Sequence, residues 1–329
     1  MLEQSVASIP LHRQRVLVLD SSSFVGARLV AALASSDWAA PIAVNCRPGT
    51  RDPAGVPTMQ FDLRSPGEMT EALRDIDAVA NCIGDDPGLI ATGAQALFAA
   101  ASQQPGLRIV HLGSMVVYGA ASGVVDEAAP LSAELGMYAA AKLSAEVAAR
   151  SHPNTVSLRP SAEYGAGSRP WSDDLARLLL AGRLGELGAN GAGQCNVVHV
   201  DDVVQAINAA IRRPELAGQV YNLSQPLTIT WNEYLGRYAQ ALGMKTVATI
   251  GAGRFAFERS LLAVVLKLVG LLLQRLGLPA PPLVSPSMGR LFRQTIRLDS
   301  SKAEQDLGLK WTPLDEGLAE AAAAYRRPH

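Results

Sequence analysis

The residues best suited to chemistry are a tyrosine and a lysine in the alanine-rich stretch MYAAAKLSAEVAAR, at Tyr138 and Lys142. Alanine favours helix, and side chains four residues apart share a helix face, so the ammonium group is expected to face the phenol. An adjacent cation favours the phenolate and lowers a tyrosine pKa from its ordinary value of about 10, which suits proton transfer near neutral pH. On its own, this spacing more often belongs to a tyrosine that merely packs along a helix.

A third candidate, Ser114, follows the apolar run IVHL at residues 109–112. Such a run is typical of a buried strand, and ligands of open α/β sheets bind beyond the carboxyl ends of the strands. A hydroxyl group at this position can hold a substrate oxygen for Tyr138. Ser114, Tyr138 and Lys142 are therefore candidate catalytic residues.

Four short apolar runs must position these side chains. They occupy residues 16–19, 42–46, 78–83 and 109–112, and a helical pattern follows each of them except the second, which a loop follows. Parallel strands need crossover connections, so this alternation predicts an α/β fold with a doubly wound, Rossmann-like parallel sheet. Further along, NVVHV and QVYNLS resemble strands, with a helix from Asp201 between them.

The chain is expected to form two domains. After Gly165 the pattern becomes irregular, and the C-terminal third is mostly helical. We predict a dinucleotide-binding Rossmann domain at residues 12–165 plus 196–224. A smaller, mostly helical substrate-binding domain is expected at residues 166–195 plus 225–329.

The composition excludes several classes of protein. The 329 residues are 48% hydrophobic, and 29 Lys plus Arg balance 30 Asp plus Glu, so no basic field is available for a nucleic acid. Cys46, Cys82 and Cys195 are far apart and lack metal-ligand spacing, so no metal site is expected. The first 15 residues lack the apolar core of a signal peptide, so we expect a cytoplasmic protein.

One apolar segment, LLAVVLKLVGLLL at residues 261–273, needs a separate interpretation. It contains Lys267 and is shorter than the roughly 20 residues that span a bilayer, so we predict no transmembrane helix. A buried helix or a subunit contact is the favoured interpretation. Peripheral membrane contact or a wall for a greasy substrate is the alternative. The prolines at residues 278–286 are expected to end the helix.

The motifs also occur in a recognisable order. Besides Ser114 and the Tyr-x-x-x-Lys pair, the chain contains DAVANCIG (77–84), LRPSAEYG (158–165), VVHVDDVVQAI (197–207), YNLS (221–224) and DSSKAEQDLGLKWTP (299–313). In this order the motifs resemble the extended short-chain dehydrogenase/reductase family, in its NAD-dependent epimerase/dehydratase group. The resemblance covers nearly the whole chain.

The resemblance implies a role for each matching position. Tyr138 would be the general acid/base, Lys142 would hold the nicotinamide ribose, and Ser114 would orient the reacting carbonyl or carbinol. Asp62 resembles the residue that contacts the adenine, although an aspartate there can also simply cap a turn. The expected cofactor-binding residues are Ser22, Ser23, Phe24, Val25, Gly26, Arg47, Asp62, Leu63, Cys82, Ile83, Tyr138, Lys142 and Pro160.

The phosphate-binding loop departs from the family pattern. The three glycines of Gly-x-x-Gly-x-x-Gly fall on Asp20, Ser23 and Gly26, so only the last is kept. A Cβ at the first two positions crowds the approach of the diphosphate, and a carboxylate aimed at it would repel it. The carboxylate can instead point into the turn, while Ser21, Ser22 and Ser23 supply hydroxyl donors or a helix cap. We expect weakened cofactor binding rather than none.

The type of cofactor follows from the end of the second predicted strand. The acidic residue that would bind a ribose 2′-hydroxyl is absent from residues 45–47, and Arg47 lies where it could meet a 2′-phosphate. This slightly favours NADP over NAD, although a solvated loop arginine is an equal alternative.

The sequence specifies the substrate less closely than the cofactor. The resemblance implies hydride transfer between nicotinamide and a carbinol or ketone carbon, in a nucleotide sugar or a bulky hydroxy compound. The family members that act on sugar nucleotides have an asparagine at a position that falls within residues 161–163 and an arginine at one within 194–196. This chain has neither of them. A further asparagine of the family is replaced by Ile90. Met115 and Val116 replace the acidic pair of dehydratases, so dehydration is the least expected reaction. The alternative function is that of a non-catalytic binding or assembly protein. Members of the family often form dimers, so the resemblance also implies a homodimer.

Overall fold

The computed structural model describes residues 13–45, 55–275, 278 and 281–327. The chain divides into two compact units. Unit 1 comprises Met1–Gly113, Gly136–Leu158 and Val204–Val220, and unit 2 comprises Ser114–Leu135, Arg159–Val203 and Tyr221–His329.

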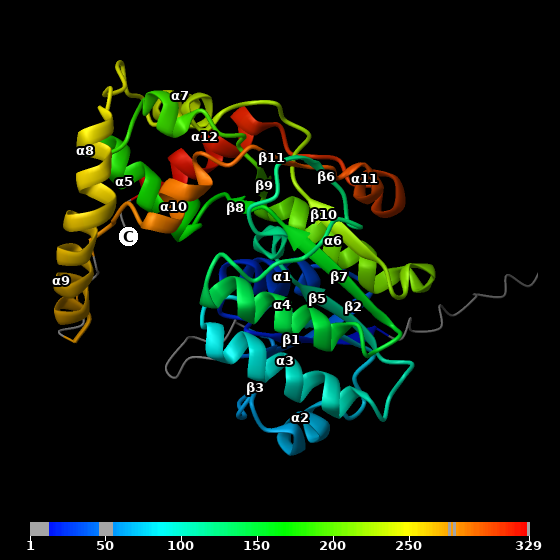
Figure 1. The fold of residues 1–329 in the computed structure, drawn as a ribbon. Coiled ribbons are helices and arrows are strands. Elements are labelled where there is room, and N and C mark those ends of the chain that lie inside the picture. Colours follow the sequence, from blue (N-terminus) through cyan, green and yellow to red (C-terminus); the bar gives the residue numbers. More distant parts are fainter. Residues whose placement is uncertain (1–12, 46–54, 276–277, 279–280, 328–329) are drawn as a thin grey trace, which may run out of the picture. The chain divides into compact units, whose positions relative to one another are not determined.

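A seven-stranded sheet of order β10-β7-β5-β4-β1-β2-β3 is the main feature of the fold (Figure 1). Its strands are β1 (Gln14–Leu19), β2 (Ala39–Val44), β3 (Thr58–Met59), β4 (Ala78–Asn81), β5 (Arg108–Leu112), β7 (Thr155–Pro160) and β10 (Val220–Leu223). The pairs from β7 across to β3 are all parallel. The predicted α/β fold with a parallel, Rossmann-like sheet is confirmed, and the four expected strands correspond to β1, β2, β4 and β5.

Helices cover both faces of this sheet. They are α1 (Phe24–Ala34), α2 (Pro66–Ala72), α3 (Pro87–Ala101), α4 (Met137–Ala149) and α6 (Val200–Arg212), with a short η4 (Pro214–Leu216). One face packs α2, α3 and α4 against alternate strand residues such as Leu17, Val79 and Ile109. Strand side chains alternate between the two faces, so the opposite face is left for α1. The end of α6 lies near this face, because the Arg212 guanidinium stacks 5.4 Å from the centroid of the Trp38 ring.

Unit 2 contains short strands and most of the remaining helices. These are η1 (Met115–Tyr118), β6 (Gly123–Val125), β8 (Ala162–Tyr164), η2 (Arg169–Asp173), α5 (Asp174–Leu180), η3 (Gly188–Gly191), β9 (Val197–His199), α7 (Trp231–Ala241), α8 (Ala252–Phe257), η5 (Glu258–Leu262), α9 (Ala263–Arg275), α10 (Pro286–Leu291), β11 (Ile296–Leu298), α11 (Ser301–Leu307) and α12 (Leu314–Tyr325). The strands pair as β6 with β11 and β8 with β9, both in parallel. The strand-like NVVHV therefore forms β9 outside the main sheet, and QVYNLS forms β10 within it.

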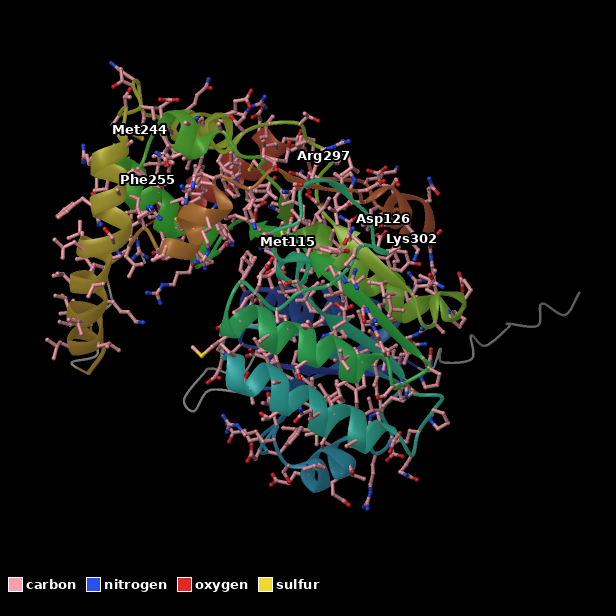
Figure 2. The ribbon with its side chains drawn as sticks, in the orientation of Figure 1. Met115, Asp126, Met244, Phe255, Arg297 and Lys302 are labelled. Atoms are coloured by element: carbon pink, nitrogen blue, oxygen red, sulfur yellow. The ribbon has the colours of Figure 1, made fainter. Side chains whose placement is uncertain are left out.

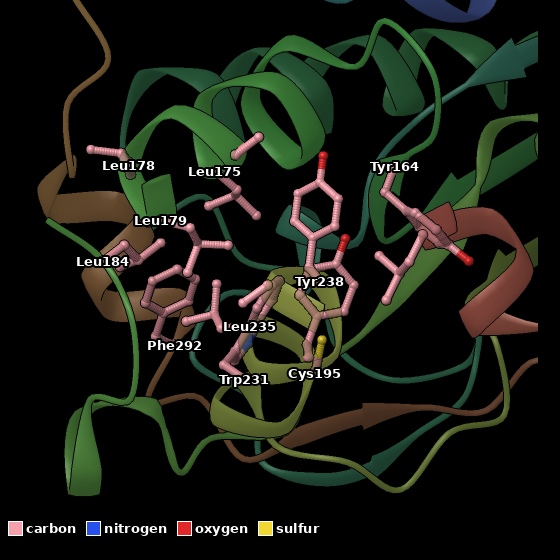
Figure 3. Packing of buried hydrophobic residues seen from close by; sticks show 14 of the residues in the cluster. Tyr164, Leu175, Leu178, Leu179, Leu184, Cys195, Trp231, Leu235, Tyr238 and Phe292 are labelled. Carbon is pink, nitrogen blue, oxygen red and sulfur yellow. The ribbon is translucent and has the colours of Figure 1, made fainter. Parts of the chain in front are cut away.

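The core of unit 2 is built around Trp231, which is fully buried (Figure 3). Its ring centroid lies 4.9 Å from that of Phe292 and 5.5 Å from that of Tyr234. The sequence TWNE places this tryptophan at the start of α7 through a capping box, in which Thr230 and Glu233 exchange hydrogen bonds between side chain and backbone. A local cap thus fixes the residue around which the aromatic core assembles.

The apolar segment 261–273 lies in η5 and α9. The expectation of a buried helix is wrong for this single chain, and the subunit contact named with it stays a prediction. Leu261, Leu268 and Leu272 are 62%, 59% and 60% exposed. Helical periodicity gives the angular position of a side chain but not whether another part of the chain covers it. Among the described residues, no helix combines the length and apolarity needed to cross a membrane.

Candidate active site

The turn between β1 and α1 keeps the backbone shape of a glycine-rich loop although two of the glycines are replaced. Asp20 has a φ of 59°, in the left-handed region that glycine enters freely and that aspartate tolerates better than most residues. Its carboxylate is directed into the protein, because Asp20 is only 3% exposed and its Oδ1 accepts a hydrogen bond from the Ser22 hydroxyl at 3.3 Å. The sequence left open whether this carboxylate enters the turn, and the structure places it there.

The serine hydroxyls stabilise the turn internally. Ser23 is the N-cap of α1: its Oγ accepts from the Gly26 amide at 3.1 Å and donates to the Asp20 carbonyl at 2.8 Å. Ser21 donates to Asn45 Oδ1 at 2.7 Å. The three hydroxyls, expected as donors or as a helix cap, thus hydrogen-bond within the protein, and Ser23 is the cap. The amides at the start of α1 are of the kind that can bind an anion.

Gly26 is kept because no larger residue fits. A Cβ at this position would lie 2.2 Å from the Asp20 carbonyl oxygen and 2.9 Å from Ser23 Oγ. The glycine lets the first turn of α1 lie directly against the end of β1, which is the role of the third glycine in dinucleotide-binding loops. Phe24 and Val25, on the same first turn, are half-buried and buried.

Lys142 lies at the carboxyl ends of two neighbouring strands. Its side chain is 2% exposed, and Nζ donates to the carbonyl of Leu112, at the end of β5, at 2.9 Å. Nζ also donates to the carbonyl of Ile83, just after β4, at 3.2 Å. Two carbonyl acceptors compensate the burial of this ammonium group and fix its position at the edge where ligands of such sheets bind.

Tyr138 lies next to this ammonium group, as predicted from the spacing. The ring centroid of Tyr138 is 5.9 Å from Lys142 Nζ, and both residues are on α4. Tyr138 is 39% exposed, whereas the lysine is buried. The pair thus combines a fixed buried cation with a partly exposed tyrosine.

Two cofactor candidates, Cys82 and Ile83, directly follow β4. The Cys82 amide donates to the Leu19 carbonyl at 3.1 Å, and its carbonyl accepts from Ser23 Oγ at 3.4 Å. The turn after β1, the end of β4 and Lys142 are therefore linked by hydrogen bonds within unit 1.

Two residues that the sequence did not single out complete this edge. Asn81, the last residue of β4, lies opposite His111 of β5, and their side chains are joined by a hydrogen bond of 3.2 Å between Nδ2 and Nδ1. Nδ1 of His111 is then the acceptor, which puts the proton of the neutral ring on Nε2. Burial, and next the charge of Lys142, lower the pKa of His111 to about 3, although Glu146 opposes the shift. The pairing of Asn81 with His111 depends on strand register, which the apolar runs alone do not specify.

The neutral His111 predicts a loss of stability in acid. Its pKa is about 3 when folded, against about 6.5 in an unfolded chain, so the unfolded state binds more protons as pH falls below 6.5. The stability that the neutral His111 contributes is therefore complete above pH 6.5 and is lost as the pH falls from 6.5 toward 3. Between pH 7 and pH 5, we expect the unfolding free energy of the original protein to fall by about 2 kcal/mol more than that of His111→Gln. Urea denaturation at the two pH values measures this difference. Equal losses in both proteins would contradict this assignment.

The remaining candidates are placed as follows. Asp62 is exposed and its Oδ1 accepts from the Arg64 amide at 3.0 Å, so it caps a turn; its contact with the adenine stays a prediction. Leu63 is buried in the core beside α3. Arg47 lies outside the described residues.

Ser114 and Pro160 belong to unit 2, whereas Tyr138 and Lys142 belong to unit 1. Ser114 follows β5 and is the N-cap of η1, with its Oγ accepting from the Val116 amide at 3.3 Å. Pro160 is the buried last residue of β7. Sequence reasoning placed Ser114 correctly after the strand, but its cap role was not predicted.

Solved structures of similar fold span nearly the whole chain. UDP-glucuronic acid 4-epimerase from Bacillus cereus, solved with NAD, has a TM-score of 0.71 and 19% identity over 95% of this chain and 99% of its own. The Bordetella bronchiseptica enzyme WbmH, solved with NAD+, has a TM-score of 0.73 and 16% identity over 96% and 99%. The dTDP-glucose 4,6-dehydratase from Bacillus anthracis, solved with NAD, has a TM-score of 0.72 and 16% identity over 95% and 96%.

A search of curated proteins finds no match to this chain. A sequence model of the NAD dependent epimerase/dehydratase family matches residues 16–224, from the first strand of the sheet to just past the last. This range includes the β1–α1 turn, Ser114 and the tyrosine–lysine pair. The chain belongs to the NAD dependent epimerase/dehydratase family.

Proposed function

We propose that this chain is an NAD(P)-dependent oxidoreductase or epimerase that acts on a carbinol or ketone carbon of a small molecule. One observation carries the proposal: a buried Lys142 is fixed to two strand-end carbonyls and lies 5.9 Å from the ring centroid of an accessible Tyr138. A surface tyrosine that merely packs along a helix has no need of a buried cation beside it. The pair has the chemistry of a proton-transfer site.

The residues present fit a dinucleotide. The left-handed turn at Asp20 and the close approach at Gly26 bring the first amides of α1 to the end of β1, where the diphosphate of a dinucleotide binds in this fold. The diphosphate would be held by the amides of Phe24 and Val25. When bound, the nicotinamide supplies the hydride acceptor or donor for the substrate carbon.

The chain's own residues would handle the proton and the orientation. Tyr138 Oη would take the proton from a carbinol hydroxyl or return it to a carbonyl oxygen. Lys142 would keep its ammonium charge beside the phenol, and Ser114 would hold the substrate oxygen. Reduction, oxidation and epimerisation share this proton transfer, so the same residues serve each reaction.

For the substrate, we propose a nucleotide sugar as the first class to test. The support is that a structural neighbour is named as a UDP-glucuronic acid 4-epimerase and another as a dTDP-glucose 4,6-dehydratase. Met115 and Val116 occupy the positions of the dehydratases' acidic pair, so epimerisation or oxidation is favoured over dehydration. Arg47 could meet the 2′-phosphate of NADPH, so NADPH is to be tested as a cofactor alongside NADH.

The cheapest test is a fluorescence titration with NADH and with NADPH. We expect saturable binding of at least one of them below millimolar concentration. Failure of both to bind at that concentration would remove the proposed function and leave a non-catalytic member of the family.

The same titration tests the departure of the loop from the glycine pattern. We expect Asp20→Gly to tighten dinucleotide binding about tenfold, because it removes a carboxylate from the turn next to the diphosphate site and places glycine at a φ of 59°. Asp20→Asn is the matched control, since it removes the charge and keeps a side chain that tolerates this φ. If only Asp20→Gly tightens binding, the backbone matters rather than the charge. Weaker binding in both variants would show that the carboxylate is needed to shape the turn.

A further inference from the structure

A continuous row of large apolar side chains is exposed from the end of α8 along η5 and α9 of unit 2. This apolar stripe consists of Phe257, Leu261, Val264, Val265, Leu268, Leu271 and Leu272, which are between 48% and 62% exposed. From Leu261 onward, the spacings of three and four residues put the side chains on one face of the helix. Such a patch, without polar interruption, is typical of an interaction surface rather than of an ordinary exposed residue.

The opposite face anchors this helix to unit 2, so its exposed face has a fixed position. Phe255 is 1% exposed and stacks on Phe292, with 6.5 Å between their centroids. Glu258 is 4% exposed and binds the Arg183 guanidinium through Oε2 at 2.8 Å. Further along, small residues face inward, at Ala263 and Gly270. Figure 2 shows Phe255 on α8 and the side chains standing out along α9 below it.

The charged residues next to the apolar stripe along the chain are mostly positive. Residues 252–273 carry Arg254, Arg259 and Lys267, with Glu258 as their one acidic residue, and Arg183 already neutralises that glutamate. The following α10 and the residue pair after it add Arg290 and Arg293 and no acidic residue. The side chain of Arg259 packs beside Gly289 of α10, which places this basic segment next to η5. The whole chain has a net charge of −1, whereas this segment has an excess of basic residues.

Exposed apolar side chains with basic neighbours distinguish between two possible occupants of the apolar stripe, a second copy of the chain and a lipid surface. A second copy of the chain, related by a two-fold axis, would bring the same basic side chains against one another. The stripe is also about 24 Å long and 10 Å wide, far below the roughly 800 Å² that each partner contributes to a stable interface. An anionic lipid surface has the opposite charge and accepts a helix lying in its plane, with the apolar face a few ångströms deep and Lys or Arg beside it.

We propose that the apolar stripe on η5 and α9 attaches the protein to an anionic membrane surface. The helix lies in the plane of the bilayer, the aliphatic side chains enter the boundary of the acyl chains, and the neighbouring basic side chains contact the lipid phosphates. No catalytic residue takes part, so membrane attachment does not depend on the proposed reaction.

The test is cosedimentation with vesicles of phosphatidylcholine alone and of phosphatidylcholine mixed with phosphatidylglycerol. We expect the partition coefficient to be at least about tenfold higher on the mixed vesicles. The triple variant Leu261→Gln, Leu268→Gln, Leu272→Gln should lose binding by at least about tenfold. Lys267→Glu with Arg290→Glu should abolish the preference for anionic vesicles while the apolar stripe is intact.

The matched control is Val124→Gln on β6, since Val124 is 59% exposed, as Leu268 is. It should bind vesicles like the original protein, and circular dichroism should show that all variants remain folded. Absence of vesicle binding by the original protein, or equal binding by the triple variant, would overturn the proposal. A dimer that sedimentation velocity finds in the original protein and not in the triple variant would identify a second copy as the occupant and would also overturn it.

Discussion

Tyr138→Phe is expected to lower kcat by about 10²–10⁴-fold and to leave the Kd for the dinucleotide within about twofold. The substitution removes only the phenolic oxygen, which is the group proposed to exchange a proton with the substrate. The ring, 39% exposed, remains next to Lys142 Nζ, so the fold and the cation–ring contact are kept. The measurement combines dinucleotide titration with product analysis on UDP-glucuronic acid and dTDP-glucose.

Tyr325→Phe is a suitable control, because it removes a tyrosine hydroxyl at the end of α12 in unit 2, away from any assigned role. It should change neither kcat nor dinucleotide binding. If Tyr138→Phe turned over substrate at the original rate, the phenol would be a surface side chain and the proposed mechanism would be wrong. Loss of dinucleotide binding together with activity would instead assign Tyr138 a binding role.

Lys142 cannot be tested as selectively. Its Nζ satisfies the carbonyls of Ile83 and Leu112 in a buried environment, so Lys142→Met leaves both acceptors without this donor. A buried acceptor that loses its hydrogen bond costs about 1–3 kcal/mol, and activity would fall together with stability. The tyrosine is the better probe of chemistry because its hydroxyl can be removed without disturbing the strand ends.

The sequence was most informative where burial and local geometry coincide. β1, β4 and β5 are buried on both faces by helices, so they are nearly continuous apolar runs and can be located from the amino-acid pattern alone. Strands of two or three residues, such as β3 and β8, are too short for a periodic signal. Tyr138 and Lys142 could be paired because helix geometry fixes side chains four residues apart.

The rest depends on contacts between distant segments. The carbonyls that hold Lys142 come from residues 30 and 59 positions away, and Asn81 meets His111 only through strand register. The exposure of α9 was not readable either, since the same aliphatic pattern suits a buried helix and a surface one. For Asp20, the family pattern indicated a tight turn, but the burial of its carboxylate depends on how the turn packs against the neighbouring strands.

Gly26→Ala is expected to lower the unfolding free energy by about 2–4 kcal/mol and to abolish dinucleotide binding. The added methyl would lie 2.2 Å from the Asp20 carbonyl oxygen, a backbone atom that cannot rotate away. The first turn of α1 must therefore move from the end of β1, and the Ser23 cap and the first amides of the helix move with it. Urea denaturation and NADH titration measure the two effects.

Gly236→Ala is the matched control because it makes the same change inside another helix. Gly236 lies within α7, and nothing is within 4 Å of the position that its Cβ would take. Alanine loses less backbone entropy on folding than glycine, so this variant should gain about 0.5–1 kcal/mol. The opposite signs of the two substitutions would show that the cost at Gly26 comes from the close approach of α1 to β1. A Gly26→Ala protein as stable as the original, with binding intact, would show that the turn can open without loss and that the last glycine of the loop is dispensable.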